Sequence, residues 1–279
     1  MIDKIEGIGE YSLIQHGKYN DRIYLMKFDV RDFPTIIDQL EILASNNDYS
    51  KVFVKVPTWT ASAFQKNDYA IEAFIPDFFY GKIDAIFMSK FLKPWRENPD
   101  LEKLDDFNLF MQECSRLEAK KIEQTEGIKL HQLKAEDAPE AAKIYSTVFN
   151  NYPFPIEDPN YIVDTMKEHV QYYGIREGEN MVAVSSAETY ETIGNVEMTD
   201  FAVLPEKRGR GYALTLLHHM EIQLKQKGFK TAYTIARMNS LSMNKTFLNL
   251  GYKYSGTLVN NTRIGEGIES MNVLYKSLQ

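Results

Sequence analysis

The chain has 279 residues, of which 44% are hydrophobic and 25% are charged, the composition of an ordinary folded protein with one large or two modest domains. Its net charge of −7 and its pI of about 5.4 exclude a generally basic surface for nucleic acid, so any bound anion needs a local pocket. The chain shows no signal-peptide core and no apolar run of membrane-spanning length, and its single cysteine, Cys114, and five histidines lack metal-ligand spacing; we therefore expect a cytoplasmic protein without membrane contact, disulfide or metal.

The first half of the chain has the pattern of an α/β domain. Residues 33–56 predict an amphipathic helix, a turn and a strand, and residues 84–92 predict the strand that closes this half. Residues 96–124 are charged and periodic, which indicates a helical connector. We therefore predict an N-terminal domain over residues 1–124 and a second domain over residues 125–279.

The second half alternates strands and helices. It begins with a short strand, Ile128–Leu133, and a helix for which Asp137 is the predicted cap. The further elements are a loop over 150–161, a helix near 160–170, strands near 171–176, 181–190 and 196–203, a helix over 211–227, a strand over 231–236, a helix over 240–252, and strands near 252–260 and 268–276. This order predicts an α/β fold.

The two halves of the sequence echo each other. In each half a phenylalanine is followed by a tyrosine after five residues and by a methionine after 24 residues. The matching positions are Phe64, Tyr69 and Met88 in the first half and Phe247, Tyr252 and Met271 in the second. The pattern indicates either a degenerate structural repeat or a chance likeness of two α/β halves. Only the second half has an Arg/Gly-rich turn before its helix, so we expect the first half to bind no cofactor.

The turn Arg208-Gly209-Arg210-Gly211 stands where a strand becomes a helix. Its glycines allow a tight turn with inward N–H groups, and the first N–H groups of the helix lack partners within the helix. With the positive end of the helix dipole and two arginines, these amides predict a phosphate or pyrophosphate site; a solvated loop is the alternative. The turn lacks the Gly-Lys-Ser/Thr of a P-loop and the third glycine of a dinucleotide fingerprint.

The segment from Arg208 to Ala213 resembles the Arg/Gln-x-x-Gly-x-Gly/Ala signature of the GCN5-related N-acetyltransferases (GNAT). More narrowly, "EMTDFAVLPEKRGRG", "YTIARMNSLSMN" and "VNNTRIGEGIESMNVLYKSL" are similar to the β-lysine N-acetyltransferases, and this resemblance spans nearly the whole chain. It implies a mixed, mostly antiparallel sheet flanked by helices, behind an N-terminal α/β half. It also implies transfer of acetyl from acetyl-CoA to the ε-amine of β-lysine, which makes the compatible solute Nε-acetyl-β-lysine.

Other activities stay open at this point. One is acetylation of another amine, such as a polyamine, an amino acid or a protein lysine, and another is a non-catalytic module that senses acyl-CoA. A transferase that uses aminoacyl-tRNA is disfavoured by the acidic balance and by the absence of a basic run. The oligomeric state is not predicted.

The resemblance implies which residues bind coenzyme A. They are Phe201, Ala202, Val203, Arg208, Gly209, Arg210, Gly211, Tyr212, Ala213, Asn244 and Phe247. A backbone amide of Ala202 or Val203 is implied as the donor to the oxyanion, and a helix-surface role is the alternative for Asn244. Phe247 occupies the position where the family often has a proton-donating tyrosine, so the general acid stays open.

A lysine-type amine has a pKa near 10.4, so its acetylation needs a proton acceptor. The resemblance implies Glu197 for this role, and alternation along the strand predicts that Glu197, Thr199, Phe201 and Val203 share one face. Asp200 is predicted on the opposite face, as the competing catalytic carboxylate. The acceptor is expected to meet the loop over 150–161 and residues near the last two strands. These are Asn260, Asn261 and Arg263, placed in the loop between those strands, and Glu269.

Overall fold

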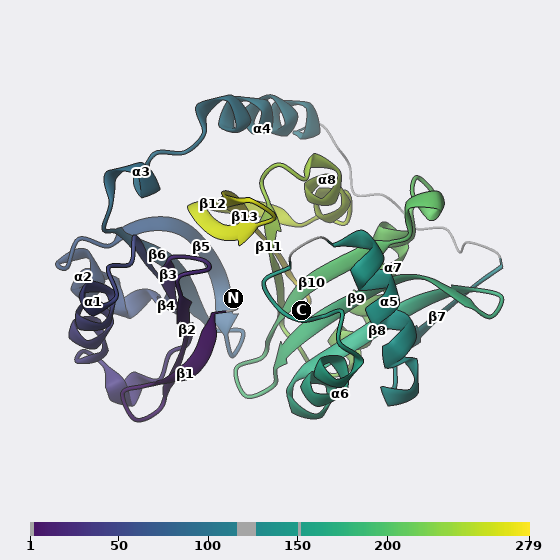
Figure 1. Cartoon of the computed structure of the whole chain (residues 1–279), viewed down its shortest axis with the longest axis horizontal. Helices are drawn as coiled ribbons and strands as arrows, with labels where there is room; N and C mark the ends of the chain where they lie inside the picture. Colours follow the sequence, from purple (N-terminus) through teal and green to yellow (C-terminus); the bar gives the residue numbers. More distant parts are fainter. Residues whose placement is uncertain (1–2, 116–126, 150–151) are drawn as a thin grey trace.

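Each half of the chain builds a mixed β-sheet with helices packed on it (Figure 1). The computed structural model describes residues 3–115, 127–149 and 152–279. The predicted domain boundary after residue 124 lies outside these residues, as do the end of the predicted connector and the first two residues of the loop over 150–161. Within the described residues, no helix is both long enough and apolar enough to cross a membrane.

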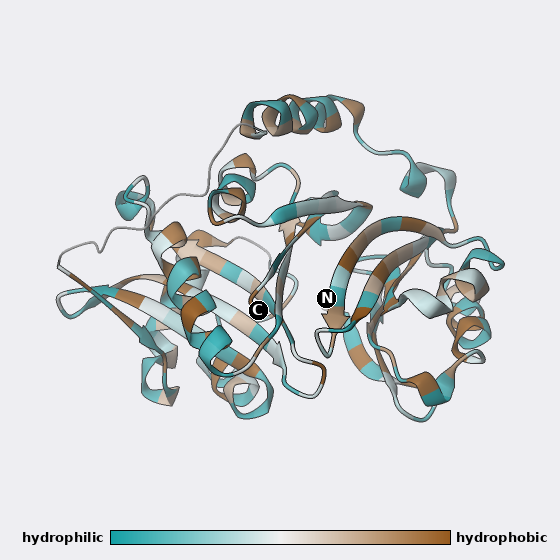
Figure 2. Ribbon diagram, turned by 180° about the vertical axis from the view of Figure 1, so that it is seen from behind, coloured by the Kyte–Doolittle hydropathy of each residue, from teal (hydrophilic) through white to brown (hydrophobic). Residues whose placement is uncertain are grey.

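The N-terminal sheet has the strand order β1-β2-β3-β4-β6-β5. Its elements are β1 Lys4–Ile8, β2 Ser12–Gly17, β3 Arg22–Lys27, η1 Val30–Asp32, α1 Ile36–Asn46, β4 Lys51–Pro57, η2 Thr58–Thr60, α2 Ala61–Gln65, β5 Ala70–Phe79 and β6 Ile83–Phe91. Every residue of the central strand β4 is buried, because α1 packs on one face of it and the C-terminal half packs on the other. In Figure 2 the curved strands of this half are mostly brown, that is, apolar.

Two helices, α3 Pro94–Glu97 and α4 Leu101–Cys114, follow the N-terminal sheet. The Asp100 carboxylate caps α4 by accepting a hydrogen bond from the Lys103 N–H at 3.3 Å. Phe107 and Phe110 of α4 pack with Met238 of the C-terminal half. The helical connector is therefore confirmed over α4, and it lies against the C-terminal half (Figure 1).

The C-terminal sheet has the strand order β12-β13-β11-β10-β9-β8-β7. Its elements are β7 Ile128–Gln132, η3 Ala135–Asp137, α5 Ala138–Val148, α6 Pro159–Glu168, β8 Val170–Glu177, β9 Asn180–Tyr190, β10 Asn195–Val203, η4 Pro205–Lys207, α7 Tyr212–Gln226, β11 Thr231–Arg237, α8 Leu241–Asn249, β12 Lys253–Ile264 and β13 Gly267–Ser277. Leucines 216, 217 and 224 fix α7 on one face, and α5 and α6 cover part of the other. The predicted elements are all present, with β12 four residues longer than expected.

The two sheets repeat one plan. In both, a helix joins two parallel strands, and a short helix and an antiparallel hairpin follow. The second strand of the hairpin pairs with the second of the two parallel strands. The Phe64 and Tyr69 rings meet edge to face at 5.1 Å and 79°, and the Phe247 and Tyr252 rings meet at 4.9 Å and 76°. This agreement in order and geometry supports the degenerate repeat over a chance likeness.

The N-terminal half packs on the same face of the C-terminal sheet as α5 and α6. Phe53, Phe78 and Phe87 of the N-terminal sheet form one apolar cluster with Tyr233 and Val273 of the C-terminal sheet. At the seam the edge strands β5 and β12 touch. A Cβ added to Gly256 would lie 2.0 Å from the Glu72 carbonyl oxygen, so this approach requires glycine.

Candidate active site

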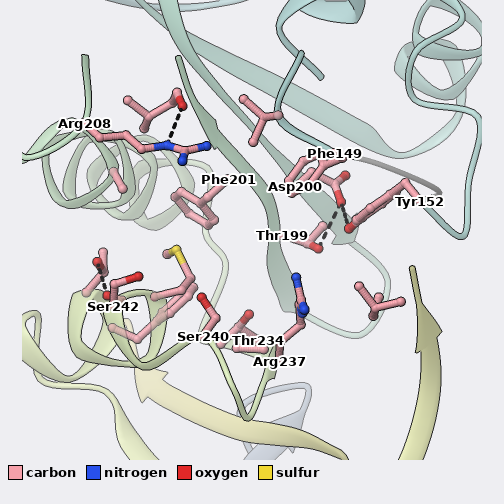
Figure 3. Close-up of a pocket in the computed structure, with 18 of the residues that line it drawn as sticks. Phe149, Tyr152, Thr199, Asp200, Phe201, Arg208, Thr234, Arg237, Ser240 and Ser242 are labelled. Carbon is pink, nitrogen blue, oxygen red and sulfur yellow. Dashed lines mark hydrogen bonds between the residues drawn. The ribbon is translucent and has the colours of Figure 1, made fainter. Parts of the chain in front are cut away.

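The strands β10 and β11 run parallel and then separate. They pair from Asn195 opposite Thr231 to Glu197 opposite Tyr233, and beyond that point no residue of one strand pairs with the other. An open cavity of about 830 Å³ lies in and beside the gap (Figure 3). Its walls include Thr199, Asp200, Phe201 and Val203 of β10, Thr234–Arg237 of β11, and residues of the Arg/Gly turn and of α8.

A β-bulge in β10 changes which residues face which way. Thr199 pairs with Ser186 of β9 and Ala202 pairs with Val184, so Asp200 and Phe201 stand opposite a single β9 residue. Asp200 takes the left-handed conformation with φ of 55°, which is uncommon for a residue other than glycine.

The predicted alternation along this strand was therefore wrong beyond Thr199. Asp200 shares the face of Glu197 and Thr199, because its carboxylate meets Ser186 and Thr199 there. Phe201 and Val203 pack on the opposite face, in the cluster under α7. The extra residue of the bulge inverts the period-two pattern, so both candidate carboxylates face the same side of the sheet.

Three hydroxyl groups hold the Asp200 carboxylate at the cavity wall, and those of Thr199 and Tyr152 are drawn in Figure 3. Ser186 Oγ donates at 2.5 Å, Thr199 Oγ1 donates at 3.3 Å, and the Tyr152 hydroxyl donates to Oδ1. Burial raises the pKa of Asp200, and these three donors oppose that rise. Tyr152 also lines the cavity, and it comes from the loop over 150–161 that the sequence analysis assigned to the acceptor without naming this residue.

Glu197 lies at the point where the two strands part, next to the cavity and not among its lining residues. It is partly buried, directly opposite Glu188 of β9. Burial raises the pKa of Glu197, while the Lys55 cation and the Tyr233 hydroxyl oppose that rise. Burial and the neighbouring Glu197 and Asp200 charges raise the pKa of Glu188 to about 8, and the Lys55 cation opposes that rise.

The Arg/Gly turn has the backbone that the sequence predicts. Gly209 and Gly211 have φ of 79° and 78°, and Gly211 is the residue before α7. Gly209, Arg208, Tyr212 and Ala213 line the cavity beside the unpaired N–H groups of the first turn of α7. This is the geometry of a pyrophosphate cradle.

The two arginines of the turn differ in position. Arg208 lines the cavity, and its Nε donates to the Val203 carbonyl at 3.3 Å. Arg210 instead pairs with Glu177 at 3.3 Å and is not a lining residue. Glu177 also accepts hydrogen bonds from Lys207 and from the Tyr212 hydroxyl. Lys207 lines the cavity, so it offers a second cation to an anionic group there. The sequence pattern did not indicate this residue.

The α8 residues also separate into two groups. Phe247 lines the cavity and meets Phe201 edge to face at 5.6 Å. Asn244 is fully buried: its Nδ2 donates to the Arg237 and Ser240 carbonyls at 2.9 Å each, and its Oδ1 accepts from Asn272. It is thus not a helix-surface residue, and its amide holds the start of α8 in place. The side chain of Ala202 packs under α5 and α6, so only its backbone is placed to act in the gap.

The predicted acceptor residues lie elsewhere than expected. β12 extends to Ile264, so Asn260, Asn261 and Arg263 are strand residues, and their placement in a loop was wrong. They join the two halves, because Asn260 Nδ2 donates to the Asn98 carbonyl at 2.8 Å and the Asn261 carbonyl accepts from Arg22 at 2.6 Å. Arg263 Nε likewise donates to a carbonyl of the N-terminal half, at 2.6 Å.

Glu269 is not a lining residue of the cavity, but it holds Arg237, which is. Both of its oxygens accept from Arg237, at 2.9 and 2.8 Å. Arg237 lines the cavity across the gap from Asp200 (Figure 3) and is half-exposed. Arg237 could not be recognised in the sequence, because a basic residue at a strand end has no local feature that separates it from a surface residue.

The N-terminal half has aromatic side chains in the place that corresponds to the gap between β10 and β11. Phe28 follows β3, Phe33 precedes α1, and Trp59 follows β4; their ring centroids lie 5.4 to 6.4 Å apart. We therefore expect one molecule of acetyl-CoA to bind per chain. Isothermal titration calorimetry measures this number, and a stoichiometry of two would contradict the assignment of a single cofactor site.

The chain is similar in sequence to known acetyltransferases. The model of the acetyltransferase (GNAT) family matches residues 138–252. The chain is 40% identical over 276 residues to the β-lysine N(6)-acetyltransferase of Methanococcus maripaludis, covering 99% of each. It is 27% identical to the N-acetyltransferase YodP of Bacillus subtilis, over 100% of both chains.

Solved structures resemble one half of the chain. The ribosomal-protein-S18-alanine N-acetyltransferase of Escherichia coli is 16% identical, with a TM-score of 0.49, and the match covers 55% of this chain and 94% of that one.

Proposed function

The chain belongs to the acetyltransferase (GNAT) family, and we propose that it transfers the acetyl group of acetyl-CoA to the ε-amine of β-lysine. The observation that carries this proposal is the 40% identity to a β-lysine N(6)-acetyltransferase over 99% of both chains. That match includes the N-terminal half, which the general family model does not cover.

The thioester of acetyl-CoA supplies an activated acetyl group, and the chain's part is to place it against a neutral amine. The turn from Arg208 to Ala213 holds the pyrophosphate with backbone N–H groups, helped by Arg208 and Lys207 at the cavity wall. The gap between β10 and β11 then directs the thioester towards Asp200. Backbone N–H groups of the separated part of β10 are the donors available to the thioester carbonyl.

The acceptor arrives as an ammonium and must lose a proton before it attacks. Asp200 anchors this ammonium at the wall, because its three hydroxyl donors keep the carboxylate oriented and favour its charged form. Glu197 takes the proton through one water molecule, because it lies beside the cavity on the same face and burial raises its pKa towards the working pH. The amine nitrogen then bonds to the acetyl carbon and the C–S bond breaks. The extra proton on the nitrogen passes to the departing sulfur or to water, so the coenzyme leaves as its thiol or thiolate.

Arg237 is the residue we propose for the acceptor carboxylate. It faces the cavity, Glu269 fixes its orientation by two hydrogen bonds, and the half-exposed guanidinium can still donate to a further anion. A β-amino acid has an amine at one end and a carboxylate at the other, whereas a polyamine has amines alone. A cavity with Asp200 on one wall and Arg237 on the other therefore favours the amino acid.

Rates with a panel of amines test the acceptor assignment. We expect the highest kcat/KM with β-lysine, lower values with α-lysine and 1,5-diaminopentane, and the smallest with a lysine peptide. Mass spectrometry should place the acetyl group on the ε-nitrogen. A diamine or peptide that exceeds β-lysine would overturn the acceptor, and tight acetyl-CoA binding without turnover of any amine would favour the sensing module.

A further inference from the structure

A lysine of the N-terminal half reaches the catalytic side of the C-terminal sheet. Lys55, on β4, is only 6% exposed, and its Nζ donates to the Tyr233 hydroxyl of β11 at 2.7 Å. Its ammonium lies between the rings of Tyr24, Phe78, Tyr190 and Tyr233, 5.0 to 5.8 Å from their centroids. Four rings and a hydroxyl fix this cation at the interface of the two halves.

The groups around this ammonium are mostly acidic. Glu188 of β9 and Glu197 of β10 are direct cross-strand partners, and Tyr233 is the partner of Glu197 on β11. Within the described residues, neither glutamate has a cation within salt-bridge distance. The Tyr233 hydroxyl stands between Lys55 and Glu197, so the three groups form one polar network in a partly buried site.

We propose that Lys55 is a positioning residue for acetyl transfer, which keeps Glu197 ionised through Tyr233 and the field of its ammonium. The inference rests on the proposed role of Glu197 as the base. The N-terminal half has aromatic rings in the place that corresponds to the gap between β10 and β11. Its direct part in the reaction is to supply the positive charge that the carboxylates of the C-terminal sheet require.

The charges of the whole cluster agree with this role. Burial alone would lower the pKa of Lys55, but Tyr24, Glu197 and Glu188 outweigh it and the pKa is raised, so Lys55 stays cationic. The Lys55 cation also opposes the rise that burial and the Glu197 and Asp200 charges cause in the pKa of Glu188. The ammonium therefore favours the charged form of both glutamates. Removal of the cation should raise the pKa of Glu197 further.

Lys55→Met tests this inference, with Lys51→Met as the matched control. Lys51 is a buried lysine on the same face of β4, but its Nζ bonds to Glu72 and to the Val259 carbonyl. For Lys55→Met we expect the acid limb of the kcat/KM profile to move up by roughly one to three pH units, with about tenfold loss per unit below the limb. Lys55→Arg, which retains the charge, should move it less, and Lys51→Met should not move it.

A double mutant separates a catalytic effect from a structural one. In the Glu197→Gln background, Lys55→Met should not lower the residual rate further, because the group that it acts on is gone. Thermal unfolding adds a readout that does not need catalysis. A carboxyl whose pKa is raised in the folded state costs stability as pH rises, so the unfolding temperature of Lys55→Met should fall more steeply between pH 6 and 9 than that of the wild type.

The outcomes distinguish the two proposals. An acid limb that stays within about 0.3 pH unit of the wild type in a folded Lys55→Met protein, while Glu197→Gln is impaired, overturns the role of Lys55 and leaves the base assignment intact. Wild-type turnover in Glu197→Gln overturns the base assignment itself. In that case the unfolding profiles still show whether Lys55 acts on the buried carboxylates.

Discussion

Glu197→Gln is expected to lower kcat at pH 7 by at least about 100-fold, the lower end of what general bases contribute. Glutamine has nearly the same shape as glutamate but cannot take a proton, so the acceptor stays an ammonium. Acetyl-CoA affinity should hardly change, because the Arg/Gly turn that we propose to bind the pyrophosphate lies beyond Val203, at the far end of β10 from Glu197. Steady-state rates and calorimetry measure the two quantities separately.

The pH dependence of this loss has a definite sign. The wild-type rate should rise with pH as Glu197 loses its proton, at a pH above the usual carboxyl range because burial raises the pKa of this group. The rate of Glu197→Gln should instead rise with the fraction of neutral amine, towards the amine pKa of about 10.4. The difference in rate between the wild type and Glu197→Gln should therefore narrow at alkaline pH.

Asp200→Asn is the control on the same face of β10. It should mainly raise KM for the acceptor, because Asp200 lines the cavity and is the residue that we propose to anchor the ammonium. If Glu197→Gln instead keeps wild-type turnover and Asp200→Asn is inactive, then Asp200 is the base. The bulge makes this a direct comparison, since the two carboxylates face the same side of the sheet.

Gly211→Val is expected to weaken acetyl-CoA binding by more than tenfold, which is about 1.4 kcal/mol. At Gly211 φ is 78°, and no atom lies within 4 Å of the place of an added Cβ. The cost is therefore one of backbone conformation: a β-branched residue disfavours this φ, and the N–H groups that start α7 turn away from the pyrophosphate.

Gly228→Val is the matched control for this variant. Gly228 follows the other end of α7, also has a positive φ, of 93°, and also has open space around the place of a Cβ. It should lose similar stability without a change in acetyl-CoA affinity. Unchanged affinity in a folded Gly211→Val protein, measured by calorimetry, would show that the turn does not hold the pyrophosphate.

The order of helices and strands in the C-terminal half could be predicted from the sequence because it depends on local pattern. Apolar residues at helical spacing fixed α7 to one face of the sheet, and two glycines beside an arginine indicated the turn before it. Asn260, Asn261 and Arg263 show the limit of this reading. Polar residues near a hairpin look like loop residues, but here they extend β12 because the N-terminal half offers a carbonyl and a guanidinium as partners.

The sequence by itself determined the fold class and the Arg/Gly turn, since each follows from neighbours along the chain, but it left the repeated plan open. The tertiary structure decided the face on which Asp200 lies and the placement of the Lys55 cation near Glu197. The first depends on a bulge, in which one extra residue inverts the alternation without any marked change in composition. The second depends on Lys55 meeting Tyr233, residues far apart in the sequence, at an interface that exists only when both sheets have folded and packed.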